Sequence, residues 1–444
     1  MLEEKIVYQI YPIGLCDCYY PNDFKSPPQE KIKIIGKWIP HIKDLGATTV
    51  LFNPLFESIY HGYDTKDFFS VDRRIGTNTS FRKLVEEIHL SGMEVMLDGV
   101  FNHVGREFSA FKDLKKRKGT SRNINWFKNV DFGSNNHYND GFSYDNWNGH
   151  DSLVKLNLGN HEVVEYIFDV VEFWIKEFGI DGLRLDAADC LDTEFIKELN
   201  NFTRNLKKNF FLVSEVIHGD YNRYINNRES QSVTNYECYK GFYSSLNDKN
   251  MFEIAYSLNR QYGNGGIYRD KVLLNFVDNH DVSRIATAVD SSFYLYPIHI
   301  LLFTVPGIPS IYYGSEWGIE GVKDDSDRKI RPYIDIENVE STAKNRDLIK
   351  TIKKLIEIRK NSSALKYGDY TEICKEAQFF SFKRRTEKEK VIVFVNTSES
   401  EYHFNSVNET GKYRDVLNDE EIVLNGNDDV KVPAFWGRIL LGEC

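Results

Sequence analysis

Two kinds of segment alternate along the chain from its first residues to about residue 360. Short runs of β-branched and aromatic residues, typical of strands, are separated by longer runs with the 3.6-residue period of amphipathic helices. The predicted strands are 6–12, 48–56, 94–101, 180–187, 210–216, 232–237, 272–279 and 310–314. Strands that alternate with helices form parallel sheets, so these eight units predict a TIM (β/α)8 barrel.

Three of the intervening runs are the clearest helix predictions. Residues 162–179, EVVEYIFDVVEFWIKEFG, place apolar residues at i, i+3, i+4 and i+7, as one face of a helix requires. Residues 30–46, EKIKIIGKWIPHIKDLG, and residues 192–208, DTEFIKELNNFTRNLKK, are predicted to be helical as well.

Two parts of the chain fall outside the barrel pattern. Residues 104–157 follow the third strand, are far too long for an ordinary βα loop and are rich in Asn, Asp, Gly and aromatic residues. We interpret them as a small inserted domain. Residues 362–444 change to alternating patterns such as VIVFVN and EIVLNG, which predict a C-terminal antiparallel β-sandwich. The catalytic barrel then comprises residues 1–103 and 158–361.

The charge balance argues against a polyanionic partner. The 444 residues include 56 Lys plus Arg against 66 Asp plus Glu, a formal net charge of -10, so nothing attracts the chain to nucleic acid or to an anionic membrane. A neutral substrate fits this balance. Aromatic residues make up 14% of the chain and could stack on sugar rings, although ordinary core packing accounts for most of them.

The N-terminus and the cysteines bear on the cellular compartment. The start, MLEEKIVYQIYP, lacks the basic and apolar regions of a signal peptide, and no apolar run approaches the roughly 20 residues of a membrane span. The six cysteines lack the spacing of a disulfide framework, which favours a reducing compartment. We therefore expect a cytoplasmic protein. Cys16 and Cys18 could bind a metal, but no second pair completes a tetrahedral site, so a structural role is favoured.

Four predicted strands end in residues suited to acid–base chemistry. These endings are Asp98-Gly-Val-Phe-Asn102-His103, Gly182-Leu-Arg184-Leu-Asp186, Ser214-Glu215 and Asp278-Asn279-His280-Asp281. In TIM barrels the catalytic residues come from the C-terminal ends of several strands. One such ending could equally be a structural salt bridge. Four together bring like charges to one rim, which is costly unless function requires it, and therefore indicate an active site.

These motifs carry a family resemblance. DGVFNH, GLRLD, SE and NHD, in this order and on these strands, resemble the four conserved regions of the α-amylase family of glycoside hydrolases. Further matches are VYQIYP on the first strand, HGYD at 61–64, KLN at 155–157 and GIPSIYYGSE at 307–316. The resemblance covers most of the chain and implies a retaining enzyme that acts on α-glucans.

The resemblance implies a role for each of three acids. Asp186 would be the nucleophile that forms a covalent glycosyl–enzyme, and Arg184 would keep it ionised. Glu215, beside the apolar Val213 and Val216, would protonate the leaving oxygen and then activate water. A retaining mechanism requires these two carboxyls about 5 Å apart. Asp281 would bind sugar hydroxyls and stabilise the charge that develops on the sugar.

Other residues of the motifs would bind the same sugar. His103 and His280 would donate hydrogen bonds, although either alone could equally be a satisfied core histidine. Tyr63 would form a platform under the ring. Asp98 belongs to the same polar set, and Arg284 would pair with Asp186 or Asp281. Tyr8 and Tyr11, on the first strand, are more typical of a core.

No cofactor is predicted, and a structural calcium ion is doubtful. Relatives with calcium continue the fourth-strand motif with Lys-His, where the histidine backbone helps to bind the ion, but in this sequence the positions are Asp189 and Cys190. Asn102 is a weak candidate ligand. The Asp- and Asn-rich residues 131–151 could offer oxygens, yet their spacing fits no calcium loop, and turns and caps are the simpler interpretation.

VKLN and SEVIHGDY are most similar to the neopullulanase, cyclomaltodextrinase and maltogenic amylase group. Members of that group commonly carry an N-terminal β domain that builds a dimer, and this sequence starts at the first barrel strand, so the oligomeric state stays open. We expect hydrolysis of α-1,4 bonds, with α-1,6 bonds as secondary targets, in maltooligosaccharides or cyclodextrins, and transfer to another sugar as a further outcome. The alternative is a transglycosylase or isomerase acting on trehalose or sucrose. A non-catalytic barrel is disfavoured because every carboxylate is present.

Overall fold

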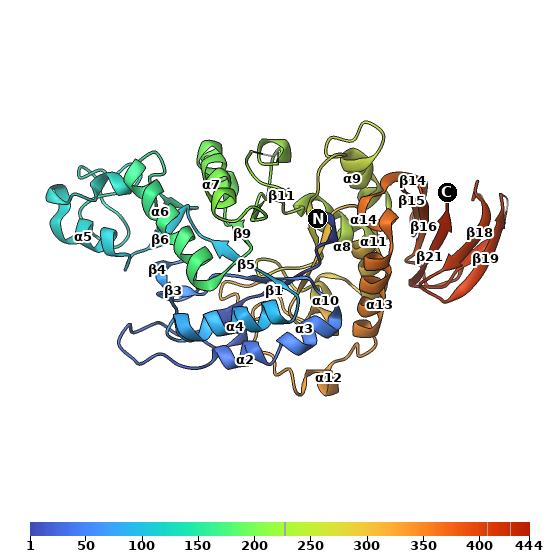
Figure 1. Ribbon diagram of the computed structural model, residues 1–444, viewed down its shortest axis with the longest axis horizontal. Coiled ribbons are helices and arrows are strands. Elements are labelled where there is room, and N and C mark those ends of the chain that lie inside the picture. Colours follow the sequence, from blue (N-terminus) through green and yellow to red (C-terminus); the bar gives the residue numbers. More distant parts are fainter. Residues whose placement is uncertain (226–227, 406, 427) are drawn as a thin grey trace. The chain divides into compact units, whose positions relative to one another are not determined.

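The computed structural model describes residues 1–225, 228–405, 407–426 and 428–444 (Figure 1). Its largest sheet has eight strands in the order β11-β10-β9-β5-β2-β1-β13-β12. They are β1 (Val7–Ile10), β2 (Thr49–Phe52), β5 (Glu94–Gly99), β9 (Gly182–Leu185), β10 (Phe211–Ser214), β11 (Ser232–Val233), β12 (Leu274–Phe276) and β13 (Ile308–Tyr312). Each overlaps a predicted strand. Thr234, directly after β11, forms a parallel bridge with Leu274 of β12, so the barrel prediction is confirmed.

The chain divides into two compact units. The N-terminal unit comprises Ile10–His41 and Thr49–Val233, and the C-terminal unit comprises Met1–Gln9, Ile42–Thr48 and Thr234–Cys444. The helices of the first 233 residues are α1 (Pro12–Leu15), α2 (Ile32–Gly36), α3 (Ile39–Leu45), α4 (Asn78–Leu90), α5 (Ser109–Arg117), α6 (His161–Phe173) and α7 (Thr193–Leu206). Those that follow are α8 (Tyr236–Asn247), α9 (Phe252–Tyr262), α10 (Ile285–Ala288), α11 (Leu295–Thr304), α12 (Val339–Thr342), α13 (Leu348–Asn361) and α14 (Ser363–Tyr367).

The helix predicted over residues 30–46 is wrong in one respect. It is broken into α2, which ends at Gly36, and α3, which begins at Ile39. Pro40 explains the break, because a proline lacks the backbone N–H and its ring clashes with the carbonyl four residues earlier, which is that of Gly36. Pro40 is tolerated instead in the first turn of α3, where that N–H would have no helical partner.

Residues after the third barrel strand form a small antiparallel sheet in the N-terminal unit. Its order is β6-β8-β7, from β6 (His103–Gly105), β8 (His150–Lys155) and β7 (Asn146–Trp147). A separate hairpin joins β3 (Phe56–Ser58) to β4 (Thr65–Val71). A Cβ at Gly105 would lie 2.3 Å from the carbonyl oxygen of Asp64, so only glycine lets β6 approach the HGYD turn this closely.

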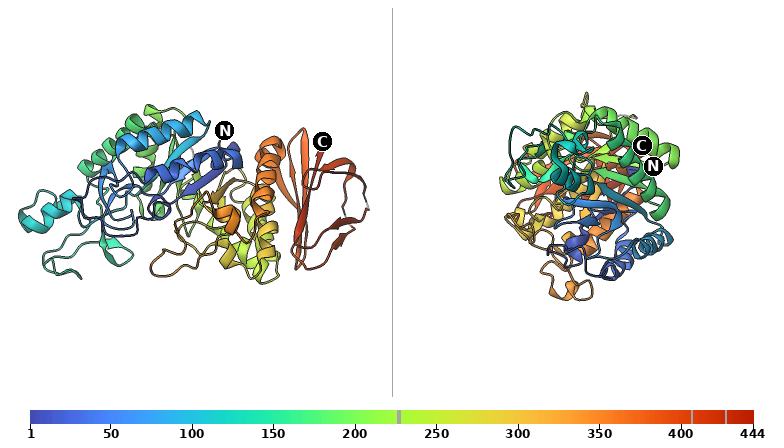
Figure 2. Two further views of the ribbon diagram at one scale, coloured as in Figure 1. Left: turned by 90° about the horizontal axis from the view of Figure 1, so that it is seen from below. Right: turned by 90° about the vertical axis from the view of Figure 1, so that its left-hand side faces the viewer.

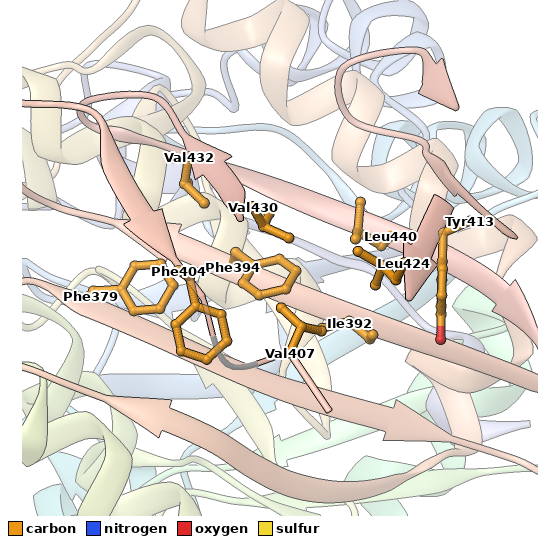
Figure 3. Close-up of a cluster of buried hydrophobic side chains, with 10 residues drawn as sticks. All are labelled: Phe379, Ile392, Phe394, Phe404, Val407, Tyr413, Leu424, Val430, Val432 and Leu440. Carbon is orange, nitrogen blue, oxygen red and sulfur yellow. The ribbon is translucent and has the colours of Figure 1, made fainter. Parts of the chain in front are cut away.

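The C-terminal unit contains a six-stranded antiparallel sheet in the order β14-β15-β16-β21-β18-β19. Its strands are β14 (Asp369–Lys375), β15 (Phe379–Arg385), β16 (Glu389–Asn396), β18 (Thr410–Asp415), β19 (Glu420–Asn425) and β21 (Trp436–Glu443). A two-stranded sheet of β17 (Tyr402–Phe404) and β20 (Val430–Val432) accompanies it. Both sheets contribute to one apolar core of ten buried side chains, among them Phe379, Phe394 and Phe404 (Figure 3). The predicted antiparallel sheet structure of residues 362–444 is therefore confirmed.

Helices α11 and α13 lie beside this sheet (Figure 2). Every side chain of α11 from Leu295 to Thr304 except that of Tyr296 is buried, because the helix packs against both α13 and strands β16 and β21. Within the residues that the structure describes, no helix combines the length and the apolar character needed to cross a membrane.

Candidate active site

Four predicted site residues form one buried ion-pair cluster in the N-terminal unit. The Nη1 atom of Arg184, on β9, lies 2.6 Å from both carboxylate oxygens of Asp98, at the end of β5. The same atom is 3.2 Å from Oδ1 of Asp186. The other terminal nitrogen, Nη2, contacts Oε1 of Glu215, which follows β10. Parallel pairing of these strands brings the four side chains to the same rim.

Arg184 is a permanent cation in this cluster. Burial by itself lowers the pKa of Arg184, but the carboxylates of Asp98, Glu215 and Asp186 outweigh it and hold the pKa well above its usual value. A fixed positive charge this close favours the ionised form of Asp186. The predicted pairing of Arg184 with Asp186 is confirmed.

The carboxyl of Glu215 is surrounded by donors. Its Oε2 accepts a hydrogen bond of 2.9 Å from the backbone N–H of Ala187, in addition to the contact with Arg184. Ala187 has a φ of 44°, in the left-handed region that costs a non-glycine residue about 1–3 kcal/mol. This strained residue directly follows the proposed nucleophile. The apolar surroundings expected from Val213 and Val216 are therefore incomplete: both valines are buried, but the oxygens of Glu215 face polar groups.

Asp98 is held by three protein groups. Its side chain is buried and accepts hydrogen bonds from Asn53 Nδ2 at 3.0 Å and from the Tyr63 hydroxyl at 2.9 Å, besides those of Arg184. Such a side chain positions Arg184 and Tyr63, and its predicted contact with a sugar stays a prediction. Tyr63 itself is half-buried. Asn53 was missed, although a lone polar residue in the strand TTVLFNPLF was a usable signal.

His103 offers an unused donor. Its Nδ1 lies 3.2 Å from Nδ2 of Asn102, which can only donate, so the proton of the neutral ring is on Nε2. That Nε2 is buried and has no hydrogen-bond partner among the described residues. Burial, with His61 nearby, lowers the pKa of His103 to about 3, so the ring is neutral at physiological pH.

Trp147, on β7, lies next to His103. The ring centroids are 5.9 Å apart, and Trp147 also stacks on His150 at 6.0 Å with an interplanar angle of 20°. The indole is half-buried. Trp147 was missed because its segment, within residues 131–151, has the composition of turns.

Asp281 stands in a second polar group, in the C-terminal unit. Its Oδ2 accepts from His280 Nε2 at 2.9 Å and its Oδ1 from Arg331 Nη2 at 2.9 Å. Gln9 Nε2 lies 2.9 Å from Nδ1 of His280 and donates to it, so the histidine proton is on Nε2 and points to Asp281. His280 is buried, whereas the Asp281 side chain is 35% exposed. His280 thus orients Asp281, and its predicted contact with sugar stays a prediction.

The predicted pairing of Arg284 with Asp186 or Asp281 is wrong. Arg284 is fully buried, and its guanidinium donates to the carbonyl oxygens of Tyr313 at 2.6 Å and Ile330 at 2.9 Å. Its guanidinium also lies over the ring of Tyr312, 4.0 Å from the centroid. The arginine that binds Asp281 is Arg331, 50 residues farther along the chain, which no motif had singled out.

Asn102 stays a weak candidate for a calcium ligand. Calcium takes six to eight oxygen ligands, commonly with several carboxylates. The Oδ1 atom of Asn102 is buried without a hydrogen-bond partner among the described residues. Those residues contain no group of three or more His, Cys, Asp or Glu side chains that could hold a metal ion. No step of the chemistry is assigned to a metal.

Comparisons with known proteins agree with this geometry. Residues 20–335 match the family profile described as "Alpha amylase, catalytic domain". A cyclomaltodextrinase of Thermoanaerobacter pseudethanolicus is 29% identical over 447 residues, which cover 95% of this chain and 75% of the relative. Neopullulanase 2 of Thermoactinomyces vulgaris is 30% identical over 449 residues, covering 95% of this chain and 74% of the relative. Among solved structures, the ligand-free cyclic α-maltosyl-(1→6)-maltose hydrolase of Arthrobacter globiformis is similar, with a TM-score of 0.83, 25% identity and coverage of 99% of both chains.

Proposed function

The chain belongs to the α-amylase family of glycoside hydrolases, and on that premise we propose that it is a retaining enzyme that hydrolyses α-1,4-glucosidic bonds in maltooligosaccharides and cyclodextrins. The proposal includes α-1,6 bonds as secondary targets and transfer to another sugar as a side reaction. The observation that carries it is Arg184, whose two terminal nitrogens contact Asp186 and Glu215 separately.

This arrangement supports double displacement. Retaining enzymes keep their two carboxyls about 5 Å apart, whereas inverting enzymes need a wider gap for a water molecule. Two carboxyls on one guanidinium fit the narrower spacing. Asp186 attacks the anomeric carbon while Glu215 gives its proton to the leaving oxygen, and water then releases the sugar from Asp186 with Glu215 as the base.

The charge of the Arg184 cluster changes during double displacement in the direction that the two chemical steps require. In the free enzyme, three carboxylates around one cation give a net charge of -2 if all are ionised, and the proposed cycle starts with one proton on the cluster. Glu215 is the partner that must carry it. Once Asp186 becomes an ester its negative charge is gone, and Arg184 then stabilises the ionised Glu215 that activates water.

The sugar contacts come from three side chains of the N-terminal unit. Tyr63 provides a half-buried ring, His103 a free N–H donor and Trp147 a second aromatic surface beside it. Aromatic faces and a few well-placed donors are what a pyranose ring requires. Asp281, held by His280 and Arg331, is assigned to the same sugar by its motif, and that assignment stays a prediction.

We place this activity in the cytoplasm. All six cysteines are free thiols, three of them buried, which suits a reducing compartment. An α-glucan oligosaccharide is the only partner proposed.

Product analysis tests the function. The enzyme is incubated separately with maltotriose, β-cyclodextrin, pullulan, isomaltotriose, trehalose and sucrose. The products are separated by chromatography, and NMR follows the anomer released. We expect maltose and glucose from maltotriose, opening of the cyclodextrin and initial release of the α-anomer. Initial β-anomer would refute retention. Cleavage of α-1,6 bonds alone, or rearrangement of trehalose or sucrose without hydrolysis, would refute the substrate assignment.

A further inference from the structure

Two arginines of the C-terminal unit are buried without an acidic partner. Arg359 on α13 and Arg384 on β15 are each 1% exposed. Among the described residues, neither guanidinium forms an ion pair with a carboxylate: Glu3 and Asp369 act on them only from beyond ion-pair distance. Buried charges in proteins are normally paired, because an isolated one is very costly to desolvate.

Backbone carbonyls accept hydrogen bonds from only some of the N–H groups of each guanidinium. Arg359 donates from Nη1 to Phe303 O at 3.0 Å and Val305 O at 3.3 Å, and from Nη2 to Gly307 O. Its Nε is buried without a hydrogen-bond partner among the described residues. A guanidinium has five N–H groups, so Arg359 has two to spare.

Arg384 is in the same situation. Its Nε and Nη2 both donate to Gly368 O, at 3.1 and 2.9 Å, and its Nη1 donates to Thr304 O at 2.9 Å. Two of its five N–H groups therefore have no acceptor. Tyr370 is the direct cross-strand partner of Arg384, and its hydroxyl is also buried without a partner in the described part of the chain. Unused donors thus come from three neighbouring side chains.

The positive charges of Arg359 and Arg384 are incompletely neutralised by their surroundings. Both arginines bind carbonyls at the C-terminal end of α11, and a helix end supplies only about half a negative charge. Burial lowers the pKa of Arg359 to about 10. Burial lowers that of Arg384 to about 9, and repulsion from Arg359 contributes to the shift. Both are still protonated at pH 7, so two cations lie close together in the protein interior.

We propose that a chloride ion binds between Arg359 and Arg384, within reach of the Tyr370 hydroxyl. A monatomic anion accepts hydrogen bonds from several directions, as donors on different side chains require. It neutralises one of the two charges and connects β14 and β15 to α13 and the end of α11. Its role is to stabilise this part of the C-terminal unit, and it takes no part in glycoside hydrolysis.

Thermal unfolding of the full chain tests the proposal. The protein is dialysed into potassium gluconate, and chloride or bromide replaces gluconate at constant ionic strength. We expect a saturable rise in Tm of about 1–4 °C by 0.2 M halide. Crystals grown with bromide should show anomalous density between the two guanidinium groups. No saturable rise, or no bromide density at this place, would overturn the proposal.

Variants connect the effect to these residues. Tyr370→Phe removes one donor without leaving a cavity and should raise the halide concentration for half of the effect severalfold. Tyr256→Phe, at a tyrosine that is 67% exposed, is the control and should change nothing. Arg384→Met should abolish the halide dependence, whereas Arg204→Met, at an exposed arginine of α7, should preserve it. Equal halide responses in Tyr370→Phe and Tyr256→Phe would contradict the site even if Arg384→Met does not fold.

Discussion

At the scale of single residues, Arg184 is the side chain that contacts both proposed catalytic carboxyls. It contacts the proposed nucleophile and the proposed acid with different nitrogens, while Asp98 fixes it from behind with both carboxylate oxygens. A guanidinium is suited to this task because its planar donors are rigid and always charged. Asp186 and Glu215 are therefore linked through one side chain, in addition to the pairing of their strands.

The first prediction concerns the nucleophile. Asp186→Asn should lower kcat on maltotriose by several powers of ten, because an amide oxygen cannot form the glycosyl ester. The substitution keeps the size of the side chain, so Tm and the circular dichroism spectrum should stay close to those of the parent. The control is Asp189→Asn, three residues later, which should retain turnover. Substantial hydrolysis by the Asp186→Asn protein would show that another group is the nucleophile.

The second prediction concerns His103 and pH. Because burial lowers its pKa to about 3, the folded state leaves His103 neutral while the unfolded chain protonates it below about pH 6.5. The unfolded state then binds more protons, so this residue's share of stability is complete above pH 6.5 and is lost as pH falls towards 3. Between pH 7 and pH 5 the loss amounts to about 2 kcal/mol.

Urea unfolding at the two pH values measures that loss. His103→Gln should lose about 2 kcal/mol less between pH 7 and pH 5 than the parent protein does. His161→Gln, at an 83% exposed side chain, should show the parental dependence. A parental pH dependence in His103→Gln would mean that the histidine is not kept neutral by the fold.

At the scale of elements, strand β7 adds an aromatic ring to the candidate active site that no sequence motif predicted. Trp147 contacts His103 and His150, with ring centroids 5.9 and 6.0 Å away. Trp147→Ala should raise KM for maltotriose by roughly 3- to 10-fold, the equivalent of one lost stacking contact, and change kcat little. The control is Trp126→Phe, at an indole that binds Glu162, and it should leave KM unchanged.

Fluorescence gives a second measurement for Trp147. In the Asp186→Asn background, added maltotriose should quench tryptophan emission, and the quenching should disappear when Trp147→Phe is introduced. Unchanged quenching and unchanged KM would show that the sugar does not contact this ring.

The barrel strands were predictable because each is a short run of β-branched and aromatic residues, and several of these runs end in polar residues. The same is true of Asp98, Arg184, Asp186 and Glu215, since parallel strands bring their C-terminal ends together. Arg331 and the backbone N–H of Ala187 were not predictable in this way. Their proximity to Asp281 and Glu215 depends on how loops return to the sheet, which no local pattern encodes.

Arg284 shows the opposite error. It lies four residues after His280 in the sequence, and that place in the motif suggested a pair with Asp186 or Asp281. The helix α10 begins directly after Arg284, and the side chain turns into the core to meet the carbonyls of Tyr313 and Ile330. Short separation along the chain does not set the direction of a side chain at the start of a helix.

At the scale of the whole molecule, the ion-pair cluster and the apolar core of the C-terminal sheets have no residue in common. The core is built from β15, β16, β17 and their neighbours, with Phe394 in ring contact with Phe379 and Phe404 at 6.3 and 6.0 Å (Figure 3). Its contribution should therefore be to stability, with little direct effect on the chemical step.

Phe394→Ala tests that separation. Truncating a fully buried phenylalanine costs about 3–5 kcal/mol, a large fraction of the 5–15 kcal/mol that keeps a domain folded. Tm should fall by several degrees, while kcat per folded molecule at 25 °C should stay within about twofold of the parent, because the Arg184 cluster is intact. Val423→Ala, at a 56% exposed side chain of β19, should leave both quantities unchanged. If instead kcat fell in a folded Phe394→Ala protein, the C-terminal core would take part in shaping the active site, and the two contributions would have to be treated as coupled.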